Sequence, residues 1–593
     1  MLERWVVLAP LVGVLLALPA IGSQRLFDDH VLELVARGST EAATPASGID
    51  LFQFANGRAS DNLALMAEGS LLPWWTDPAL KITFYRPLSS LLHRLDYAAW
   101  PGHPELMYVH TLLWFGLLLA LVVRLYARLE ARPAVASLAA WLFAVNDAHG
   151  TLVGWLSNRN ALVSAVGAVA ALLTHARARR DGHGWSRLWA PLWLGFSLLA
   201  GELGVSTWAL LLSYALVFEA GPLLRRLRSL WPFALVTLGW GVLYVESGAG
   251  THASGVYLHP LSDLPAFAAE FPRRALVLLG AAFGPVPSDL SFLGPLRLMP
   301  LWLGVAGAWV GVFLWVARRE LIADRVARFW SIAIGLCVVP LAASFPSDRL
   351  LVLVNVGAMA LVARALIGLA SRPLPLAAEP WGAAPSGALA RGFGWALFVV
   401  HALLPPLLLP VRAHQMQELG YATEHAFAGL ERIDELERKT LIVLGAPADF
   451  FVSYLQASRA ARGLARPEHV YWFANPEAGL ELRLTSERTL SMQRDGGFFV
   501  TPPEALYRKP SAPLALNARV SLPELSVSVS RVTTAGVPEA VELSFDEPLT
   551  DDRFVFLALR GCAYERIAPG DLQRLEVASA LPLAAFLSSC HEK

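Results

Sequence analysis

Two adjacent carboxylates, Asp28 and Asp29, follow directly after the first apolar segment of the chain, which runs from Trp5 to Gly22. A carboxylate held at a lipid surface can act as a general base, and a second one can shift its pKa or help to hold a divalent cation. The alternative interpretation is an acidic pair in water, where most carboxylates lie. The position at the lipid boundary is informative, but the functional interpretation depends on the further polar motifs that accompany this pair.

Three arginines accompany polar motifs at the ends of later apolar segments. Arg86 follows Tyr85, Arg159 follows Asn158, and Arg349 precedes a late segment. A guanidinium keeps its charge and offers forked donors to phosphate oxygens, so these residues are candidates for a phosphate site. The alternative is that they reach lipid headgroups from the membrane edge. Arg159 is the strongest candidate, because an unpaired charge within a helical pattern is costly.

Two further polar residues each leave two interpretations open. His110 enters the second apolar span, either as a hydrogen-bonded residue of the bundle or as a base. Glu202 falls in a very short turn between spans, either as an acid facing a cavity or as a helix-turn cap. Both residues are therefore included among the candidates for the site.

The composition is that of a polytopic membrane protein. Of the 593 residues, 55% are hydrophobic and 16% are charged, and the mean hydropathy is +0.48. Forty-eight basic and 48 acidic residues give zero net charge, which excludes a nucleic-acid binder or a polybasic membrane-surface protein. Cys337, Cys562 and Cys590 lack metal-ligand spacing. In an oxidising compartment Cys562 and Cys590 either form a disulfide or remain two buried thiols.

Eleven apolar segments are predicted to cross the membrane, since a span needs about 20 mainly apolar residues. They lie near residues 5–22, 106–126, 133–149, 152–174, 187–201, 203–219, 229–246, 299–316, 327–345, 350–370 and 393–411. The first is predicted to be a retained anchor, because the small-residue cleavage site of a signal peptide is poor here. The segment 275–290 is broken by glycine and prolines and is predicted to be interfacial or re-entrant.

Arginine placement predicts the orientation, because short cytoplasmic loops accumulate basic residues. Arginines cluster in alternate loops, whereas residues 23–105 carry more acidic than basic side chains. The N-terminus is therefore predicted to be cytoplasmic, and the loop 23–105 and everything after Arg412 extracytoplasmic. We expect a transmembrane domain over residues 1–412, a connecting helix over 413–438 and an outer domain over 439–593.

The two outer regions carry their own secondary-structure patterns. Pro87 is expected to open a helix whose leucines repeat at helical spacing, which favours a place in the membrane interface. In the tail, residues 441–444 predict a strand and 450–462 a helix. Alternating apolar positions between 480 and 556 predict half-buried antiparallel strands. The predicted fold class is mainly α, a transmembrane helix bundle with a β-rich α+β domain at its C-terminal end.

The ordered motifs over residues 5–370 resemble one group of membrane enzymes. The motifs are the acidic pair Asp28 and Asp29 after the first span, the Tyr-Arg-Pro-Leu element at 85–88, the polar start of the fourth span around Arg159, and Glu202. Together they resemble polyprenyl-phosphate-sugar-dependent glycosyltransferases of the GT-C fold, most closely bacterial relatives of the tetratricopeptide-containing O-mannosyltransferases. The motifs also share one predicted face of the membrane.

The resemblance implies an inverting hexosyl or mannosyl transferase of a bacterial inner membrane, with a polyprenyl-phosphate sugar as donor and a protein or glycan as acceptor. Asp28 matches the family's catalytic aspartate and is the expected general base. No cofactor is expected apart from a divalent cation, if any, at Asp28 and Asp29. The candidate site residues are the catalytic Asp28 and Asp29 and the substrate-binding Tyr85, Arg86, His110, Asn158, Arg159, Glu202 and Arg349.

Two other classes of protein share the predicted architecture. A transporter would also have many spans and buried polar residues, but transporters usually show internal repeats and helices broken near mid-membrane. Here the polar motifs gather at the outer helix ends. A catalytically inactive scaffold with a partner-binding tail is the third hypothesis, and the presence of Asp28 favours an enzyme over it.

Overall fold

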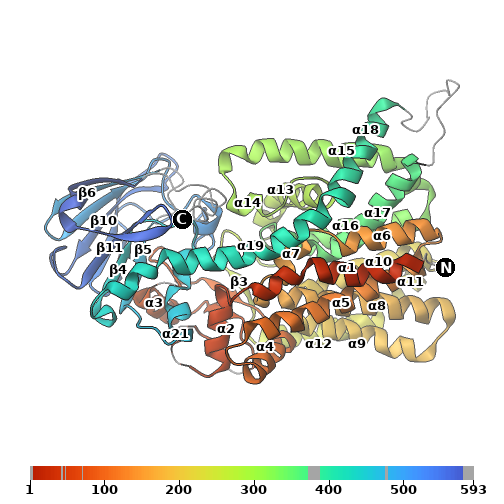
Figure 1. Cartoon of the computed structure of the whole chain (residues 1–593), viewed down its shortest axis with the longest axis horizontal. Helices are drawn as coiled ribbons and strands as arrows, with labels where there is room; N and C mark the ends of the chain where they lie inside the picture. The colour runs from red at the N-terminus through yellow and green to blue at the C-terminus, as the bar shows by residue number, and fades with distance from the viewer. Residues whose placement is uncertain are drawn as a thin grey trace.

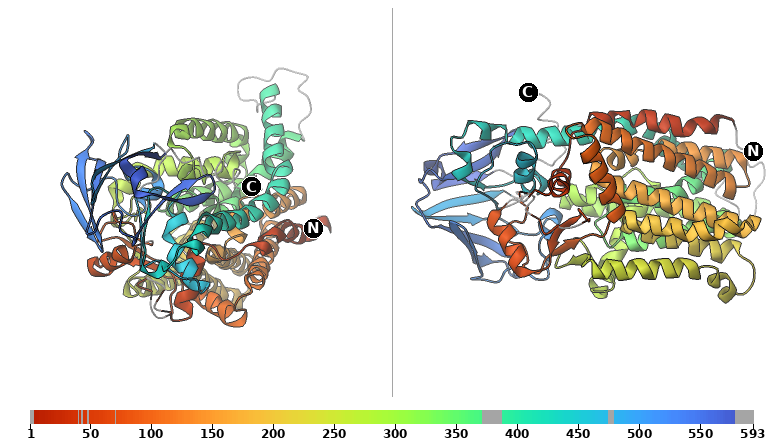
Figure 2. Two further views of the ribbon diagram at one scale, coloured as in Figure 1. Left: turned by 60° about the vertical axis from the view of Figure 1, so that its left-hand side comes forward. Right: turned by 90° about the horizontal axis from the view of Figure 1, so that it is seen from below.

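Helices form a long bundle at one end of the molecule and β-sheets gather at the other (Figure 1). The structure is a computed structural model that describes residues 4–39, 41, 44–46, 49–69, 71–370, 387–473 and 479–577. The N-terminus lies at the end of the bundle farthest from the sheets, and the short helices of the first outer segment lie between bundle and sheets (Figure 1; Figure 2, right). The first outer segment and the tail therefore share one end of the bundle.

The bundle combines buried central helices with outer helices that expose apolar side chains. Its helices are α1 Ala9–Leu16, α5 Pro104–Leu129, α6 Pro133–Ala144, α8 Arg159–Asp181, α9 Gly184–Ala200, α10 Thr207–Phe218, α12 Trp231–Glu246, α13 Leu264–Phe283, α15 Met299–Ala323, α16 Arg325–Leu341 and α17 Val352–Ala370. Most residues of α8 and α17 are buried, whereas only Phe233 is buried on α12. An apolar helix with an exposed apolar surface is what contact with lipid requires.

Five of the helical segments are long and apolar enough to cross a membrane, or six if one bent pair counts as a single span. The five are Trp5–Gly22, Pro104–Leu129, Leu156–Asp181, Leu296–Ala323 and Asp348–Ala370. All five coincide with predicted spans, but the predicted count of eleven is not confirmed. Five further predicted spans are helices of 12 to 17 residues. At about 1.5 Å per residue such helices are shorter than the hydrocarbon core of about 30 Å.

The first outer segment consists of helices and a small sheet. Its elements are α2 Asp28–Ala36, α3 Ala59–Glu68, α4 Pro87–Ala99, β1 Gln53–Asn56 and β2 Lys81–Thr83, and β2 also pairs with β3 Gly250–His252. The predicted helix at Pro87 is confirmed. Its Leu91 and Leu95 are exposed, while His93 and Asp96 on the opposite face are buried. This helix therefore points its apolar face outward and its polar face into the protein.

A long helix, α19 (Pro405–Ala426), connects the bundle with the sheets (Figure 1). It follows α18 (Ala388–Phe398) after a π-helical turn (Val399–Leu403), and the helix axis bends by 44° between the two parts. Two 3₁₀ turns, Ala428–Arg432 and Leu436–Arg438, lead from α19 to the first strand of the tail. The predicted boundary at residue 412 thus lies in the middle of a continuous helix.

The tail forms two sheets around a shared apolar core. One is mixed, in the order β12 (Ala563–Ile567), β11 (Phe554–Arg560), β4 (Thr440–Val443), β5 (His469–Trp472). The other is antiparallel, in the order β13 (Arg574–Val577), β6 (Leu480–Ser486), β7 (Thr489–Gln493), β10 (Pro538–Phe545), β9 (Leu525–Val532), β8 (Arg519–Leu522). The predicted strands are confirmed, although β11 pairs parallel to β4. The predicted helix at 450–462 is divided into α20 (Phe450–Ser453) and α21 (Leu455–Ala461).

The cysteines are only partly within the described residues. Cys337 lies on α16, and its buried thiol donates a hydrogen bond to the carbonyl of Ser206. Cys590 lies outside the described residues, so its pairing with Cys562 stays a prediction.

The orientation can be tested with reporters at the two ends of the chain. Alkaline phosphatase joined after Lys593 is expected to be active and green fluorescent protein at the same place dark, because arginine sorting predicts an outer tail. The same reporters at Met1 are the controls and should give the opposite pattern. A fluorescent C-terminal fusion would contradict the orientation.

Candidate active site

The turn before α2 fixes the two predicted catalytic carboxylates at the end of the bundle that faces the sheets (Figure 1). Phe27 has a φ of 46°, a backbone conformation that costs energy for a side chain of this size. Asp29 is fully buried: its Oδ2 accepts a hydrogen bond from the Leu26 amide (2.9 Å) and its Oδ1 accepts two from Ser157. Asp29 therefore fastens α2 to the segment that precedes α8.

Asp28 is half-buried, and its environment suits a base. Its Oδ1 accepts a hydrogen bond from the Trp155 indole at 3.0 Å. Burial raises the pKa of Asp28 to about 6, against the opposing effect of the positive charge of Arg349. The pKa of Asp29 is raised as well, by burial and by repulsion from Asp28. A carboxylate with a pKa near 6 is largely ionised at neutral pH and still basic enough to accept a proton.

Arg349 contacts the same tryptophan. Its guanidinium is 5.3 Å from the ring centre of Trp155 and 5.2 Å from that of Phe345, and its Nη1 donates a hydrogen bond to Asn158 at 2.8 Å. Stacking and a single hydrogen bond hold the side chain while leaving it without a carboxylate partner among the described residues. The structure thus brings together the predicted Asp28, Asn158 and Arg349.

Arg86, Tyr85 and Glu202 form a second group beside the first. The Arg86 Nε donates to one carboxylate oxygen of Glu202 at 2.8 Å, and the Tyr85 amide donates to the other at 3.1 Å. The Arg86 guanidinium also lies 4.2 Å from the ring centre of Phe84. Its positive charge lowers the pKa of Asp28, although less than that of Arg349 does. Glu202 thus orients the arginine and the backbone of the Tyr-Arg-Pro-Leu element.

Arg159 and His110 belong to a buried network within the bundle. Arg159 is 1% exposed and ion-pairs with Asp96, and it also donates to Thr111 and to the Met107 carbonyl, both at 2.9 Å. His110 binds the same Asp96 through Nδ1 at 2.7 Å. Among the described residues no hydrogen bond or ion pair joins either side chain to Asp28. The network ties together α4, α5 and α8.

Loss of the Arg159 side chain is expected to destabilise the bundle strongly. Arg159→Gln would leave Asp96 as a buried charge with a weaker partner, and breaking a buried pair costs about 3–5 kcal/mol. Arg128→Gln is the matched control, because its partner Asp181 is exposed and such pairs contribute about 0–1 kcal/mol. Denaturation of the purified proteins in SDS measures both changes. Equal stability of the two variants would contradict the structural role.

A cluster of one arginine and three aspartates was not predicted from the sequence. Arg412 on α19 contacts Asp147 at 3.0 Å, Asp289 at 3.1 Å and Asp348 at 2.7 Å. Asp348 also accepts hydrogen bonds from the amide and hydroxyl of Ser288, at 2.8 and 2.7 Å. This cluster fixes Asp348, the residue next to Arg349, and it attaches α19 to the bundle. Its members are far apart in sequence, so spacing gave no signal for it.

The tail also contacts the site. The Phe27 ring centre lies 4.7 Å from that of Phe450, 6.2 Å from that of Tyr454 and 5.5 Å from that of Trp155. Aromatic side chains of α20 and of the residue that follows it therefore cover the strained turn before Asp28. Because aromatic runs are usually core residues, the sequence alone did not indicate this contact.

The arrangement does not fit a divalent cation held by both Asp28 and Asp29. The oxygens of Asp29 already accept three hydrogen bonds from the protein, which leaves Asp28 alone facing the site. Among the described residues no group of three or more His, Cys, Asp or Glu side chains is placed to hold a metal ion. We therefore assign no step of the chemistry to a metal.

Comparison with known proteins gives weak likenesses only. No protein-family model and no curated protein matches the chain. Three solved structures of an oligosaccharyltransferase from Archaeoglobus fulgidus are similar: with a tethered acceptor peptide (TM-score 0.37, 12% identity), in the apo form (0.38, 12%) and with an inhibitory peptide and dolichol-phosphate (0.34, 13%). Each match covers 79% of this chain but only 64–65% of the other. Likenesses of this size do not establish a common activity.

Proposed function

We propose that the protein is a membrane glycosyltransferase that transfers a sugar from a polyprenyl-phosphate donor to an acceptor hydroxyl on the extracytoplasmic side. The observation that carries the proposal is the placement of Asp28 and Arg349 on the same tryptophan, Trp155, at the outer end of an apolar bundle. A base and a cation at the lipid boundary are the two groups that this reaction needs. The resemblance of the sequence motifs to such enzymes supports the same conclusion.

In the proposed reaction Asp28 takes the proton of the acceptor hydroxyl while the hydroxyl oxygen attacks the anomeric carbon. The bond between that carbon and the phosphate oxygen breaks, and the electron pair leaves with the polyprenyl phosphate. Arg349 and Arg86 neutralise the charge that develops on the departing phosphate. One displacement inverts the configuration at the anomeric carbon.

The remaining candidates have supporting roles in this proposal. Asn158 holds Arg349, Glu202 holds Arg86 and Tyr85, and Asp29 fixes the turn that carries Asp28. His110 and Arg159 stabilise the helices below the site and do not touch the donor. A bacterial inner membrane, a hexosyl or mannosyl donor and a protein or glycan acceptor complete the proposal and rest on the resemblance.

Transfer by the purified protein tests the proposal. The protein in liposomes is supplied with radiolabelled polyprenyl-phosphate mannose, glucose or galactose and with acceptor peptides or glycans, and the label in the acceptor is followed. Transfer with inversion, read from the NMR coupling constant at the anomeric carbon, is expected for one donor. Movement of the labelled donor across the membrane without a glycosylated product would favour a transporter. A donor that is neither consumed nor moved would favour a catalytically inactive scaffold.

A further inference from the structure

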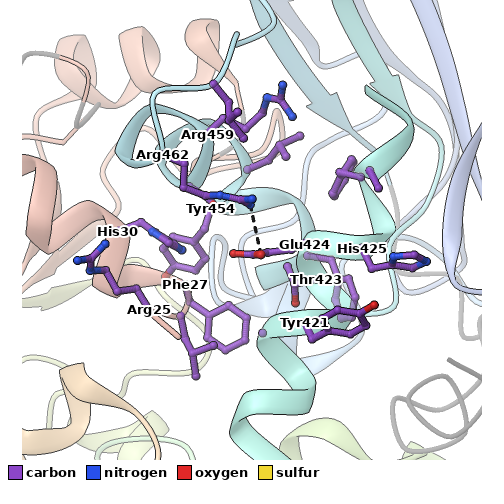
Figure 3. A pocket seen from close by; sticks show the side chains of 18 of the residues that line it. Arg25, Phe27, His30, Tyr421, Thr423, Glu424, His425, Tyr454, Arg459 and Arg462 are labelled. Carbon is purple, nitrogen blue, oxygen red and sulfur yellow. Dashed lines mark ion pairs between the residues drawn. The ribbon is translucent and has the colours of Figure 1, made fainter. Parts of the chain in front are cut away.

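A cavity lies beside the strained turn at Phe27. It has a volume of about 280 Å³ and is formed by Arg25, Leu26, Phe27 and His30, by the end of α19 with the turn that follows it, and by residues between Phe451 and Leu464 (Figure 3). A cavity of this size accommodates a small organic molecule. None of the proposed catalytic residues lines it, although its wall residues Phe27 and Tyr454 also border the site of Asp28.

The wall of the cavity is largely apolar but contains several nitrogen donors. Phe27, Leu26, Phe451 and Leu455 are among the apolar side chains. Arg25, His30, His425, Arg459 and Arg462 bring basic groups, against two glutamates, Glu424 and Glu431. A ligand of the cavity therefore meets an apolar surface with an excess of donors.

Two buried side chains of this wall have polar atoms without a partner. His30 is 6% exposed, and its Nδ1 makes no hydrogen bond within the described part of the chain. Arg459 is 5% exposed; its Nε and Nη1 bind the Ala465 carbonyl and Glu431, but its Nη2 has no hydrogen-bond partner among the described residues. Buried polar groups are nearly always satisfied, so both atoms point to a ligand or water.

The chemistry of these atoms selects the ligand. An arginine Nη2 can only donate, so the group that satisfies it must accept. Burial and the charges of Arg25 and Arg462 lower the pKa of His30 to about 3, against the effect of a hydrogen bond between its ring and the Arg25 backbone, so the ring is neutral and its single N–H is used in that bond. An oxygen anion therefore accepts from Arg459, and the aromatic wall suits an apolar body attached to that anion.

We propose that this cavity binds a small molecule in which an oxyanion, such as a phosphate monoester, is attached to an apolar or aromatic body. Two of its lining residues, Arg462 and Glu424, form an ion pair whose charged atoms lie 3.3 Å apart (Figure 3). The site is independent of the proposed transfer reaction, since its residues are not those of the catalytic group.

The test measures binding of phenyl phosphate to the full-length protein in phosphatidylcholine nanodiscs by isothermal titration calorimetry. Inorganic phosphate and phenol are the comparison probes, because each carries one half of the proposed ligand. Phenyl phosphate is expected to bind at least about tenfold more tightly than either, which is about 1.4 kcal/mol. Equal affinities for phenol and phenyl phosphate, or binding of inorganic phosphate alone, would overturn the proposal.

Two variants of the ion pair between Arg462 and Glu424 should change the affinity in opposite directions. Arg462→Gln leaves Glu424 to repel the anion and should weaken binding about twofold to fivefold, whereas Glu424→Gln should strengthen it by a similar factor. Arg466→Gln is the matched control, because this arginine also pairs with an exposed glutamate but does not line the cavity. The same direction of change in the Arg462 and Glu424 variants would contradict the proposal.

A third variant tests whether the probe binds in this cavity. Nanodiscs of a second lipid composition test whether the bound anion is a lipid headgroup or a water-soluble molecule. Ser458→Phe places a ring in the cavity and should abolish binding; unchanged binding would place the probe elsewhere. In nanodiscs that contain phosphatidate, loss of phenyl phosphate binding would identify a lipid headgroup as the competing anion. Retained binding would identify a water-soluble ligand of the same chemistry.

Discussion

Asp28→Asn is expected to lower sugar transfer by about two to four orders of magnitude, the usual contribution of a general base. The amide keeps the size of the side chain and can still accept the hydrogen bond of the Trp155 indole, so folding and donor binding should change little. Initial rates with purified protein and radiolabelled donor measure the effect. Asp61→Asn, on α3 of the same outer segment, is the matched control and should retain full activity.

The pH dependence gives a second readout of the same residue. The base acts in its ionised form, and the pKa of Asp28 is about 6, so the rate should rise as the pH increases through 6 and become constant above about pH 7. The residual activity of Asp28→Asn should lack this rise. Near-normal turnover of the variant, or an identical pH profile, would show that Asp28 is not the base.

Arg349→Gln should have the next largest effect, a loss of about two to three orders of magnitude in kcat. Removal of one group that stabilises developing negative charge costs about 2.7–4 kcal/mol in the transition state. Arg349→Lys should recover part of the loss, because it restores the charge without the planar stacking on Trp155. Single-turnover rates at saturating donor separate this effect from donor binding.

The Arg349 variant should also shift the pH profile. The positive charge of Arg349 opposes the rise in the pKa of Asp28, so the pKa of Asp28 should increase further when that charge is lost, and the profile should move to higher pH. Arg318→Gln is the control. Arg318 also stacks on a tryptophan, Trp315, but it lies near a helix end that is predicted to be cytoplasmic. An unshifted profile with reduced kcat would mean that Arg349 does not act on Asp28.

Local sequence patterns predicted the helices and strands better than they predicted which of these elements contact one another. The helix at Pro87 and the strands after residue 480 follow from periodicity, which needs only neighbouring residues. The count of eleven spans is not confirmed, because apolar composition does not reveal where a helix ends, and α6 and α10 end after 12 residues. The role of α19 as one helix from the bundle to the sheets was missed because its composition changes from apolar to polar along its length.

The candidate site was predictable where position along the chain sufficed. The position of Asp28 could be predicted because it follows a few residues after the first apolar segment, and Asp28 lies near Arg349; its role as the base stays a prediction. The partner of Arg159 could not be predicted, because Asp96 is 63 residues away and many acidic residues were available. The same holds for Arg412, whose partners come from three different parts of the bundle. Long-range pairing of charges is decided by tertiary structure, which spacing does not encode.

The unbroken α19 has a mechanical consequence. From Arg412 to Ala426 the helix rises by roughly 21 Å at about 1.5 Å per residue, with Arg412 anchored in the bundle and the far end against the sheets. A helix of this length is stiff, so it would rotate as one body about its attachment at Arg412. The tail can tilt with it, but it cannot swing away as a domain on a flexible tether would. Small rotations about Arg412 would move the wall around Phe27 and the segment before Arg349 together.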